Sequence, residues 1–231
     1  MERLEHKSFI YHWLEHTFHH EVVPDHVIMA VFIAIVLAVF ALWFKSRIRV
    51  ENPGKLQLLL ETVVGALKDM ILDNIGTRGR PFLGLIGTLG LFILACNWIG
   101  LVPYFSSPTT SLNYPVGCAI VAFLYYNYQG IRAHGAAQYF KHFMGPLPVL
   151  APLMLPIELI SHFSRMVSLS LRLFGNIFGE ELVIAALGFM VAFLVPVPMM
   201  LFGVFGGLLQ AFVFIMLTMV YLGGAVASEE H

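Results

Sequence analysis

Residues 168–194, SLSLRLFGNIFGEELVIAALGFMVAFL, combine a helix of membrane-spanning character with charges that lipid disfavours. Arg172 lies near the start of the stretch, and Glu180 and Glu181 follow about two turns later. An arginine at the centre of a bilayer costs about 2.5–3.5 kcal/mol on insertion scales, so it persists where it faces protein, water or an opposite charge. The stretch therefore predicts a helix that packs against something other than lipid.

The whole chain has the composition of a membrane protein. Of its 231 residues, 58% are hydrophobic and 12% are charged, whereas soluble domains average about 25% charged residues. We therefore expect an all-α polytopic membrane protein with a single membrane domain over residues 1–231. The net charge of −1 argues against a nucleic-acid partner. Cys96 and Cys118 lie in apolar runs and imply neither a disulfide framework nor a thiol metal site, and no cofactor is expected.

Five segments are expected to cross the membrane as helices. The first is an uncharged apolar run of 18 residues, about the length that spans the hydrocarbon core. The expected membrane helices are residues 27–44, 81–103, 115–131, about 149–195, and 197–221. The fourth is too long for a simple span, because it would extend about 69 Å against a core of about 30 Å. It either breaks near Pro152 and Pro156 or lies strongly tilted.

Basic residues predict the orientation. Residues 45–80 carry seven Lys and Arg residues, whereas the linker 104–114 carries none. Short basic loops stay on the cytoplasmic side, so the polar N-terminal segment 1–26 is expected outside and the C-terminus inside. Residues 54–76 have apolar side chains at helical spacing with charges between them, which predicts an amphipathic helix at the membrane interface.

The fourth segment carries a polar stripe. Helical spacing places small and polar residues on one face: Ser161, Arg165, Ser168, Arg172, Gly175, Asn176 and Gly179. Glu158 falls within about 40° of this face, Glu181 points to the opposite side, and Glu180 lies between. Arg172 either pairs with a carboxylate inside the bundle or faces another chain. We favour another chain, because no carboxylate of this helix lies beside it on the stripe.

The last expected helix carries a second stripe of Gly203, Gly207 and Gln210, with Gly206 beside it. Glycines permit close helix packing. Gln210 is an amide that needs hydrogen-bond partners when buried, and the charged helix is the expected place to find them.

Several motifs together resemble subunit a of the F-type ATP synthase, the membrane stator beside the rotating c-ring. They are SLSLRLFGNIFGEEL, LLQAFVFIMLTMVYLGGAVASEEH, NPGKLQLLLETVVGALKDMI, GLVPYF and PIELISHFSR. The resemblance runs in order from about residue 25 to the C-terminus. It implies a helical bundle whose long, strongly tilted helices pack against a c-ring, with two offset aqueous half-channels that couple proton translocation to rotation and ATP synthesis. No bond-making catalysis by this chain is implied.

The resemblance also implies roles for individual residues. Arg172 matches the arginine that faces the proton-carrying carboxylate of each c subunit, and Asn176 and Gln210 match polar residues near it. Glu181 and Glu158 match acidic positions in the two half-channels. Ser168, on the arginine's stripe, and Glu180 complete the candidate set for proton translocation.

The implied partners are the c-ring, the peripheral-stalk b subunits, the F1 catalytic head through the complex, and the lipid membrane. The implied location is the bacterial inner (plasma) membrane, with the N-terminus periplasmic and the C-terminus cytoplasmic. A thylakoid membrane is the second option.

One position departs from the pattern. Well-studied bacterial members have a histidine seven residues before the glutamine, paired with the acid that matches Glu181. This chain has Gly203 there. We hypothesise that Glu180 compensates.

Two other functional classes were weighed. A secondary transporter would use Arg172 to hold an anionic solute, but such folds often show internal repeats, and none is found here. Residues 12–16, HWLEH, fit the H-x-x-E-H zinc-protease pattern, without a surrounding domain to complete a site. His162 either lines a channel or forms hydrogen bonds within the bundle, and the second role is favoured.

Overall fold

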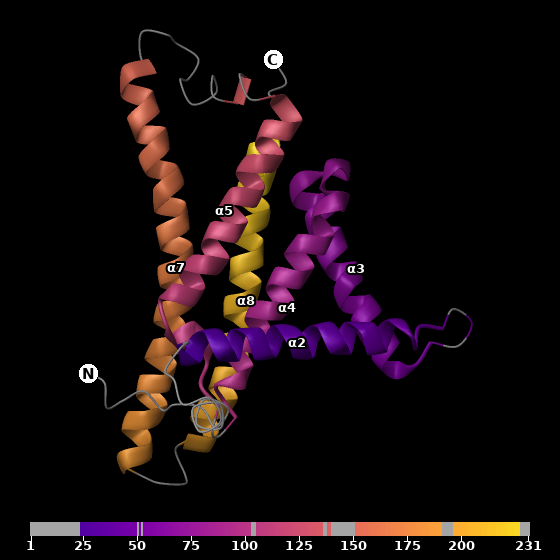
Figure 1. The fold of residues 1–231 in the computed structure, drawn as a ribbon, viewed down its shortest axis with the longest axis vertical. Coiled ribbons are helices and arrows are strands. Elements are labelled where there is room, and N and C mark those ends of the chain that lie inside the picture. The colour runs from indigo at the N-terminus through magenta and orange to yellow at the C-terminus, as the bar shows by residue number, and fades with distance from the viewer. Residues whose placement is uncertain are drawn as a thin grey trace.

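A computed structural model shows the chain as a bundle of long helices (Figure 1). The structure describes residues 24–49, 51, 53–102, 105–135, 138–139, 151–190 and 196–226. The helices are α2 (Asp25–Lys45), α3 (Lys55–Ile75), α4 (Leu83–Ile99), α5 (Asn113–His134), α7 (Ala151–Met190) and α8 (Pro196–Val226). Two short 3₁₀ helices, η2 (Thr77–Phe82) and η3 (Pro108–Thr110), connect them. Across these residues no strand is present, which confirms the all-α fold class.

Three helical stretches are long and apolar enough to cross a membrane: Asp25–Lys45, Thr77–Ile99 and Pro198–Val226. They correspond to the first, second and fifth of the expected spans. The third and fourth expected spans form α5 and α7, but both carry more polar residues. That these two helices also cross the membrane remains a prediction from the sequence.

Two glycines end helices where the backbone turns into the left-handed region. Gly76 follows α3 with φ of 76°, and its amide donates to the Leu72 carbonyl at 2.9 Å. Gly135 follows α5 with φ of 80°, and its amide donates to the Ile131 carbonyl at 2.8 Å. Only glycine adopts this conformation without a steric cost from a Cβ atom.

Helix α7 continues through its prolines. Pro152 is the second residue of the helix, where no backbone N–H bond is needed, and Pro156 lies inside it. The expected alternative of a break at Pro156 is therefore wrong, because losing a single amide donor near the start does not interrupt the later turns; the residues directly before Ala151 lie outside the described part. At 40 residues, α7 is about 60 Å long. Figure 1 shows α2 running across the directions of α5, α7 and α8.

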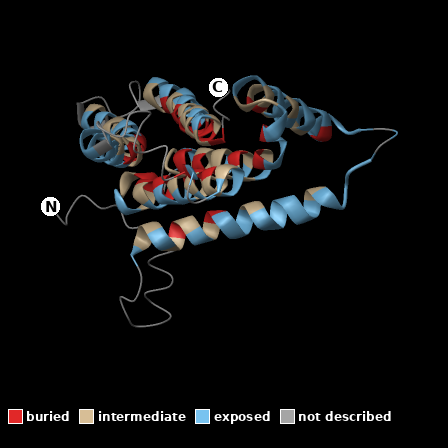
Figure 2. Cartoon of the chain, turned by 90° about the horizontal axis from the view of Figure 1, so that it is seen from above, coloured by how far each residue is buried: buried red, intermediate tan, exposed pale blue. Residues whose placement is uncertain are grey.

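The core lies between α4, α5, α7 and α8, with α8 in contact with all three other helices. One cluster includes Ile93 of α4, Leu173 of α7 and Phe214 of α8. A second cluster joins α3 and α8 through Ile71 and Leu222, among others. Figure 2 shows buried positions concentrated among these helices, whereas α2 is exposed along most of its length.

Gly207 permits a close approach between α4 and α8. A Cβ atom at this position would lie 3.1 Å from Trp98 Cδ1 and 3.2 Å from Asn97 Cβ. The Asn97 amide donates to the Gly207 carbonyl at 3.1 Å, and the Trp98 indole donates to the Val204 carbonyl at 2.9 Å. The expected glycine packing is thus present, and α4 is the helix that packs there.

We expect Gly207→Val to destabilise the bundle by about 1–3 kcal/mol, because the added side chain overlaps the two residues that tie α4 to α8. Gly224→Val is the matched control, since a Cβ atom at Gly224 meets nothing within 4 Å on the same helix. The measurement is thermal unfolding of the purified complex in detergent. Equal melting temperatures for the two variants would contradict close packing at Gly207.

Candidate functional site

Arg172 lies on the face of α7 that points away from the bundle. Its helical neighbours Leu169 and Leu173 are buried in the core, whereas Arg172 is exposed. No carboxylate in the described part of the chain lies within ion-pair distance of its guanidinium. The alternative of an ion pair within the bundle therefore finds no support among these residues.

The surface around Arg172 is a shallow groove along α7. Its lining residues are Leu159, Ile160, Phe163, Ser164, Val167, Ser168, Leu171 and Arg172. Ser168 lies one turn before Arg172 on this face and is exposed, as the predicted stripe requires. A guanidinium at one end of an apolar groove needs a covering surface that is largely apolar and supplies a negative charge.

Asn176 and Gln210 join α7 to α8. The Asn176 side-chain amide donates to the Gln210 Oε1 at 2.6 Å, and Gln210 is 2% exposed. This confirms the expectation that Gln210 finds its partner on the charged helix. The Gln210 Nε2 atom has no hydrogen-bond partner within the described segments.

The rest of the predicted stripe divides between two environments. Gly175 is exposed beside Arg172, but Arg165 turns toward α8, where its guanidinium carbon lies 5.4 Å from the centre of the Tyr221 ring. An aromatic face attracts a cation electrostatically. Arg165 is therefore held within the bundle, and Arg172 is the stripe's exposed arginine.

Glu180 lies against α8 in the space beside Gly203 and Gly206. A Cβ atom built on Gly203 would overlap Glu180 Oε1, and one built on Gly206 would lie 3.2 Å from Glu180 Oε2. The carboxylate thus fills the volume that any larger residue at position 203 would need. The sequence predicted neither this contact nor its reason, because it depends on how α7 and α8 cross.

Glu181 points to a different helix. Its Oε1 atom would lie 3.2 Å from a Cβ atom at Gly100, the residue after α4, where Ser107 also approaches. The two adjacent carboxylates therefore separate, Glu180 toward α8 and Glu181 toward the end of α4. Both are partly buried.

Glu158 lies on the other side of Arg172 along the helix. It precedes Arg172 by 14 residues and Glu181 follows by nine, so the acids lie about 21 Å and 14 Å away along the axis. Glu158 Oε1 is 3.6 Å from His162 Nε2, and the Glu158 side chain is 39% exposed. Helix α7 thus places one cation between two separated acidic positions.

Sequence reasoning missed several residues that line these contacts: Asn97, Trp98, Gly100, Ser107 and Tyr126. Asn97 and Trp98 interrupt the end of an apolar run, which was a usable signal. The positions of Gly100 and Ser107 beside Glu181 depend on tertiary packing and leave no local pattern.

Comparison with known proteins decides the family. Residues 26–223 match the family model described as ATP synthase A chain. The chain belongs to this family. Subunit a of Geotalea daltonii is 48% identical over 179 residues, which are 78% of this chain and 77% of that protein. Subunit a of Solibacter usitatus is 45% identical over 197 residues, 85% of this chain and 84% of that protein. Subunit a of a Sulfurihydrogenibium species is 42% identical over 208 residues, which are 90% of this chain and 99% of that protein.

Proteins of this family are the stator subunits of Fo, the membrane sector of ATP synthase. The chain is therefore a subunit that serves ATP synthesis and proton transport and is not itself the catalytic subunit. The transporter and zinc-protease alternatives have no comparable support. The HWLEH motif at residues 12–16 lies outside the described residues.

We expect Asn176→Ala to destabilise the α7–α8 contact by about 1–3 kcal/mol, because it leaves the buried Gln210 Oε1 without its donor. The matched variant is the double substitution Asn176→Ala with Gln210→Leu, which removes both polar groups and recovers part of the loss. Thermal unfolding of the purified complex measures both. Gln210→Leu alone completes the cycle, and if the double variant loses as much stability as the two single variants together, the bond makes no contribution.

Proposed function

We propose that this chain forms two offset aqueous half-channels that carry protons to and from the carboxylates of a c-ring. The observation that carries the proposal is the placement of Arg172 on an open, apolar helix face, with an acid on either side along the same helix. An exposed cation on a face otherwise suited to a protein partner indicates a partner that brings the opposite charge.

Arg172 acts through its charge. A c-subunit carboxylate that passes the guanidinium is stabilised in its ionised form and is kept from holding a proton there. The same positive charge repels a proton that would pass directly between the half-channels. Each proton must then load on one side of Arg172, travel with the ring, and leave on the other. Moving one charge through 100 mV corresponds to about 2.3 kcal/mol, which the rotation transmits to the catalytic head.

The outer half-channel runs to Glu181 and Glu180. Support comes from their partial burial at the junction of α4, α7 and α8, where side chains of Asn97 and Ser107 also lie. Asn97 Oδ1 is buried without a hydrogen-bond partner in the part of the chain that the structure describes. A buried polar atom of this kind is the usual site of an ordered water.

The inner half-channel runs to Glu158. This residue lies toward the start of α7, on the side of Arg172 opposite Glu180 and Glu181. Its partial exposure gives the carboxylate access to water. Proton exchange at Glu158 and at Glu181 is thereby separated along α7 by the arginine.

The assembly and location follow from the same proposal. The c-ring packs over the open faces of α7 and α8, the b subunits connect the chain to the F1 head, and the complex lies in a bacterial inner membrane. The relatives quoted above are bacterial, and the seven basic residues of 45–80 favour a cytoplasmic loop there.

With α2 along the membrane normal, the arrangement in Figure 1 leaves α7 and α8 strongly tilted. The five crossings, periplasmic N-terminus, interfacial α3 and cytoplasmic C-terminus remain part of this proposal.

We expect Arg172→Ala to abolish ATP-driven proton pumping in vesicles that carry the whole complex, because nothing then favours release of the proton from the ring. The matched control is Arg132→Gln, which removes an exposed arginine at the end of α5 and leaves pumping near the wild-type rate. Pumping by an assembled Arg172→Ala complex at the wild-type rate would overturn the proposed function.

We also expect Glu180→Gln to reduce pumping by about tenfold. In the proposed pathway Glu180 accepts and releases the proton in place of the absent histidine, and an amide cannot do so. Gly203→Ala is expected to lower pumping as well, because the new methyl group displaces the Glu180 carboxylate. Gly224→Ala on the same helix is the control. Undiminished proton flow in an assembled Glu180→Gln complex would remove Glu180 from the pathway.

A further inference from the structure

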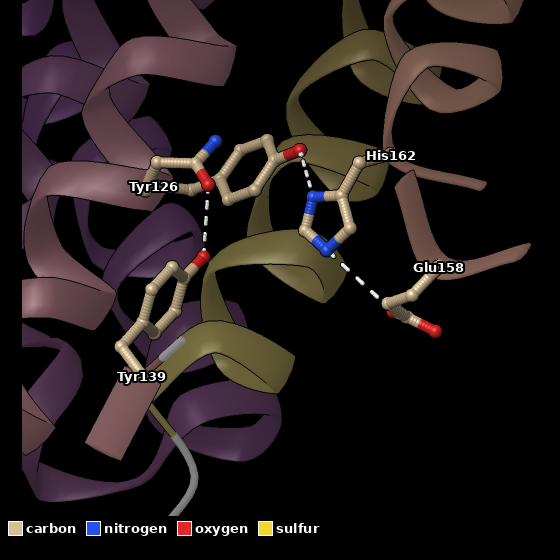
Figure 3. Close-up of polar contacts among 5 residues, drawn as sticks. Tyr126, Tyr139, Glu158 and His162 are labelled. Atoms are coloured by element: carbon tan, nitrogen blue, oxygen red, sulfur yellow. Dashed lines mark hydrogen bonds and ion pairs between the residues drawn. The ribbon is translucent and has the colours of Figure 1, made fainter. Parts of the chain in front are cut away.

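His162 links α7 to α5 and also approaches the acid proposed for the inner half-channel. Figure 3 shows its ring between Tyr126 and Glu158. The Tyr126 hydroxyl lies 3.0 Å from His162 Nδ1, and His162 Nε2 lies 3.6 Å from Glu158 Oε1. His162 is 8% exposed and Tyr126 is 3% exposed. The expected hydrogen bond within the bundle is thus present, and the second ring nitrogen faces the acid.

The two contacts constrain the imidazole. When the Tyr126 hydroxyl donates to Nδ1, the neutral ring carries its proton on Nε2, which directs an N–H toward the Glu158 carboxylate. When the ring takes a second proton, both nitrogens become donors and the Tyr126 oxygen accepts. In either state the contact with α5 keeps Nε2 oriented toward Glu158.

Other titratable groups surround the ring on every packed helix. On α7, Glu158 and Arg165 lie about one turn to either side of His162. Tyr126 comes from α5, and Tyr221 of α8 has its ring centre 6.1 Å from that of Tyr126. Tyr139, after α5, donates to Asn127 Oδ1 at 2.9 Å. Within this group Glu158 is the anion, so a charge gained by the imidazole acts directly on its carboxylate.

We propose that His162 is a positioning residue for Glu158, which orients the carboxylate and sets the pH range over which it exchanges protons with the cytoplasm. This inference rests on the proposed function, because it concerns the inner half-channel. Histidine changes its charge between pH 5 and 8. A protonated His162 lies 3.6 Å from the Glu158 carboxylate and attracts its ionised form, an effect that a neutral residue at position 162 lacks.

The test uses inverted membrane vesicles that carry the whole complex, so that the buffer reaches the cytoplasmic face. ATP-driven pumping is followed with a potential-sensitive dye between about pH 5.5 and 8 and divided by the ATP hydrolysis rate of uncoupled vesicles. His162→Gln keeps hydrogen-bonding groups but cannot take a charge. We expect the acid limb of its pH profile to move upward by about half to one unit.

Three further variants make the result specific. Tyr126→Phe keeps His162 and removes the hydroxyl that holds it, and we expect a smaller shift of the pH profile in the same direction. If the complex with His162→Gln does not assemble, the Tyr126→Phe profile is the test of the inference. His134→Gln removes a histidine at the end of α5 and leaves the profile unchanged. In a Glu158→Gln background, His162→Gln produces no additional shift, because His162 acts through that carboxylate.

The inference is overturned if His162→Gln, or Tyr126→Phe where only that variant assembles, has the wild-type profile. It is also overturned if His162→Gln shifts the profile equally with Glu158→Gln present. Arg172→Ala in the same vesicles distinguishes a failure of the proposed function from a failure of the role of His162. Pumping by that variant overturns the proposed function, whereas a loss of pumping together with an unshifted His162→Gln profile removes only the role of His162.

Discussion

The charge of Arg172 is the constraint on which the rest of the arrangement depends. A guanidinium on a helix in a membrane protein must be covered by something that compensates its charge, and the described part of the chain brings no carboxylate to it. The helix that carries it therefore has two different faces. One packs into the core through Leu169, Leu173 and Ile177, and the other, which carries Arg172, stays open.

This division of α7 determines what its neighbours must do. Because one face of α7 stays open, α5 and α8 hold the helix through its inner face. Polar contacts at several positions along α7 fix its rotation. Asn176 with Gln210, Arg165 with Tyr221, and His162 with Tyr126 each join α7 to one of these helices. Directional contacts of this kind resist rotation about the helix axis better than apolar contacts alone, and rotation would turn Arg172 away from the open face.

The sequence predicted what is periodic and local, and much less of what depends on tertiary structure. Helical spacing correctly placed Ser168 and Arg172 together on an open face, and the need of a buried amide for a partner correctly linked Gln210 to α7. The same reasoning left open whether α7 breaks at Pro152 and Pro156, because the cost of a proline depends on its distance from the helix start. It could not predict that Asn97 and Trp98 bind α8 carbonyls, since the α4–α8 crossing brings together residues more than 100 positions apart.

The position of Glu180 gives a physical reason for the glycine at 203. The carboxylate fills the space beside α8 that a side chain at position 203 would take, so the two positions share one volume. A histidine at 203 and a glutamate at 180 cannot both occupy it, and a titratable group reaches this point from one helix or from the other. Substituting glycine for the expected histidine therefore leaves a titratable group in place. In the proposed pathway, the group then comes from α7 instead of α8. It is an acid that is neutral when protonated, whereas a histidine is a base that is cationic when protonated. The local charge is therefore lower by one unit in both protonation states.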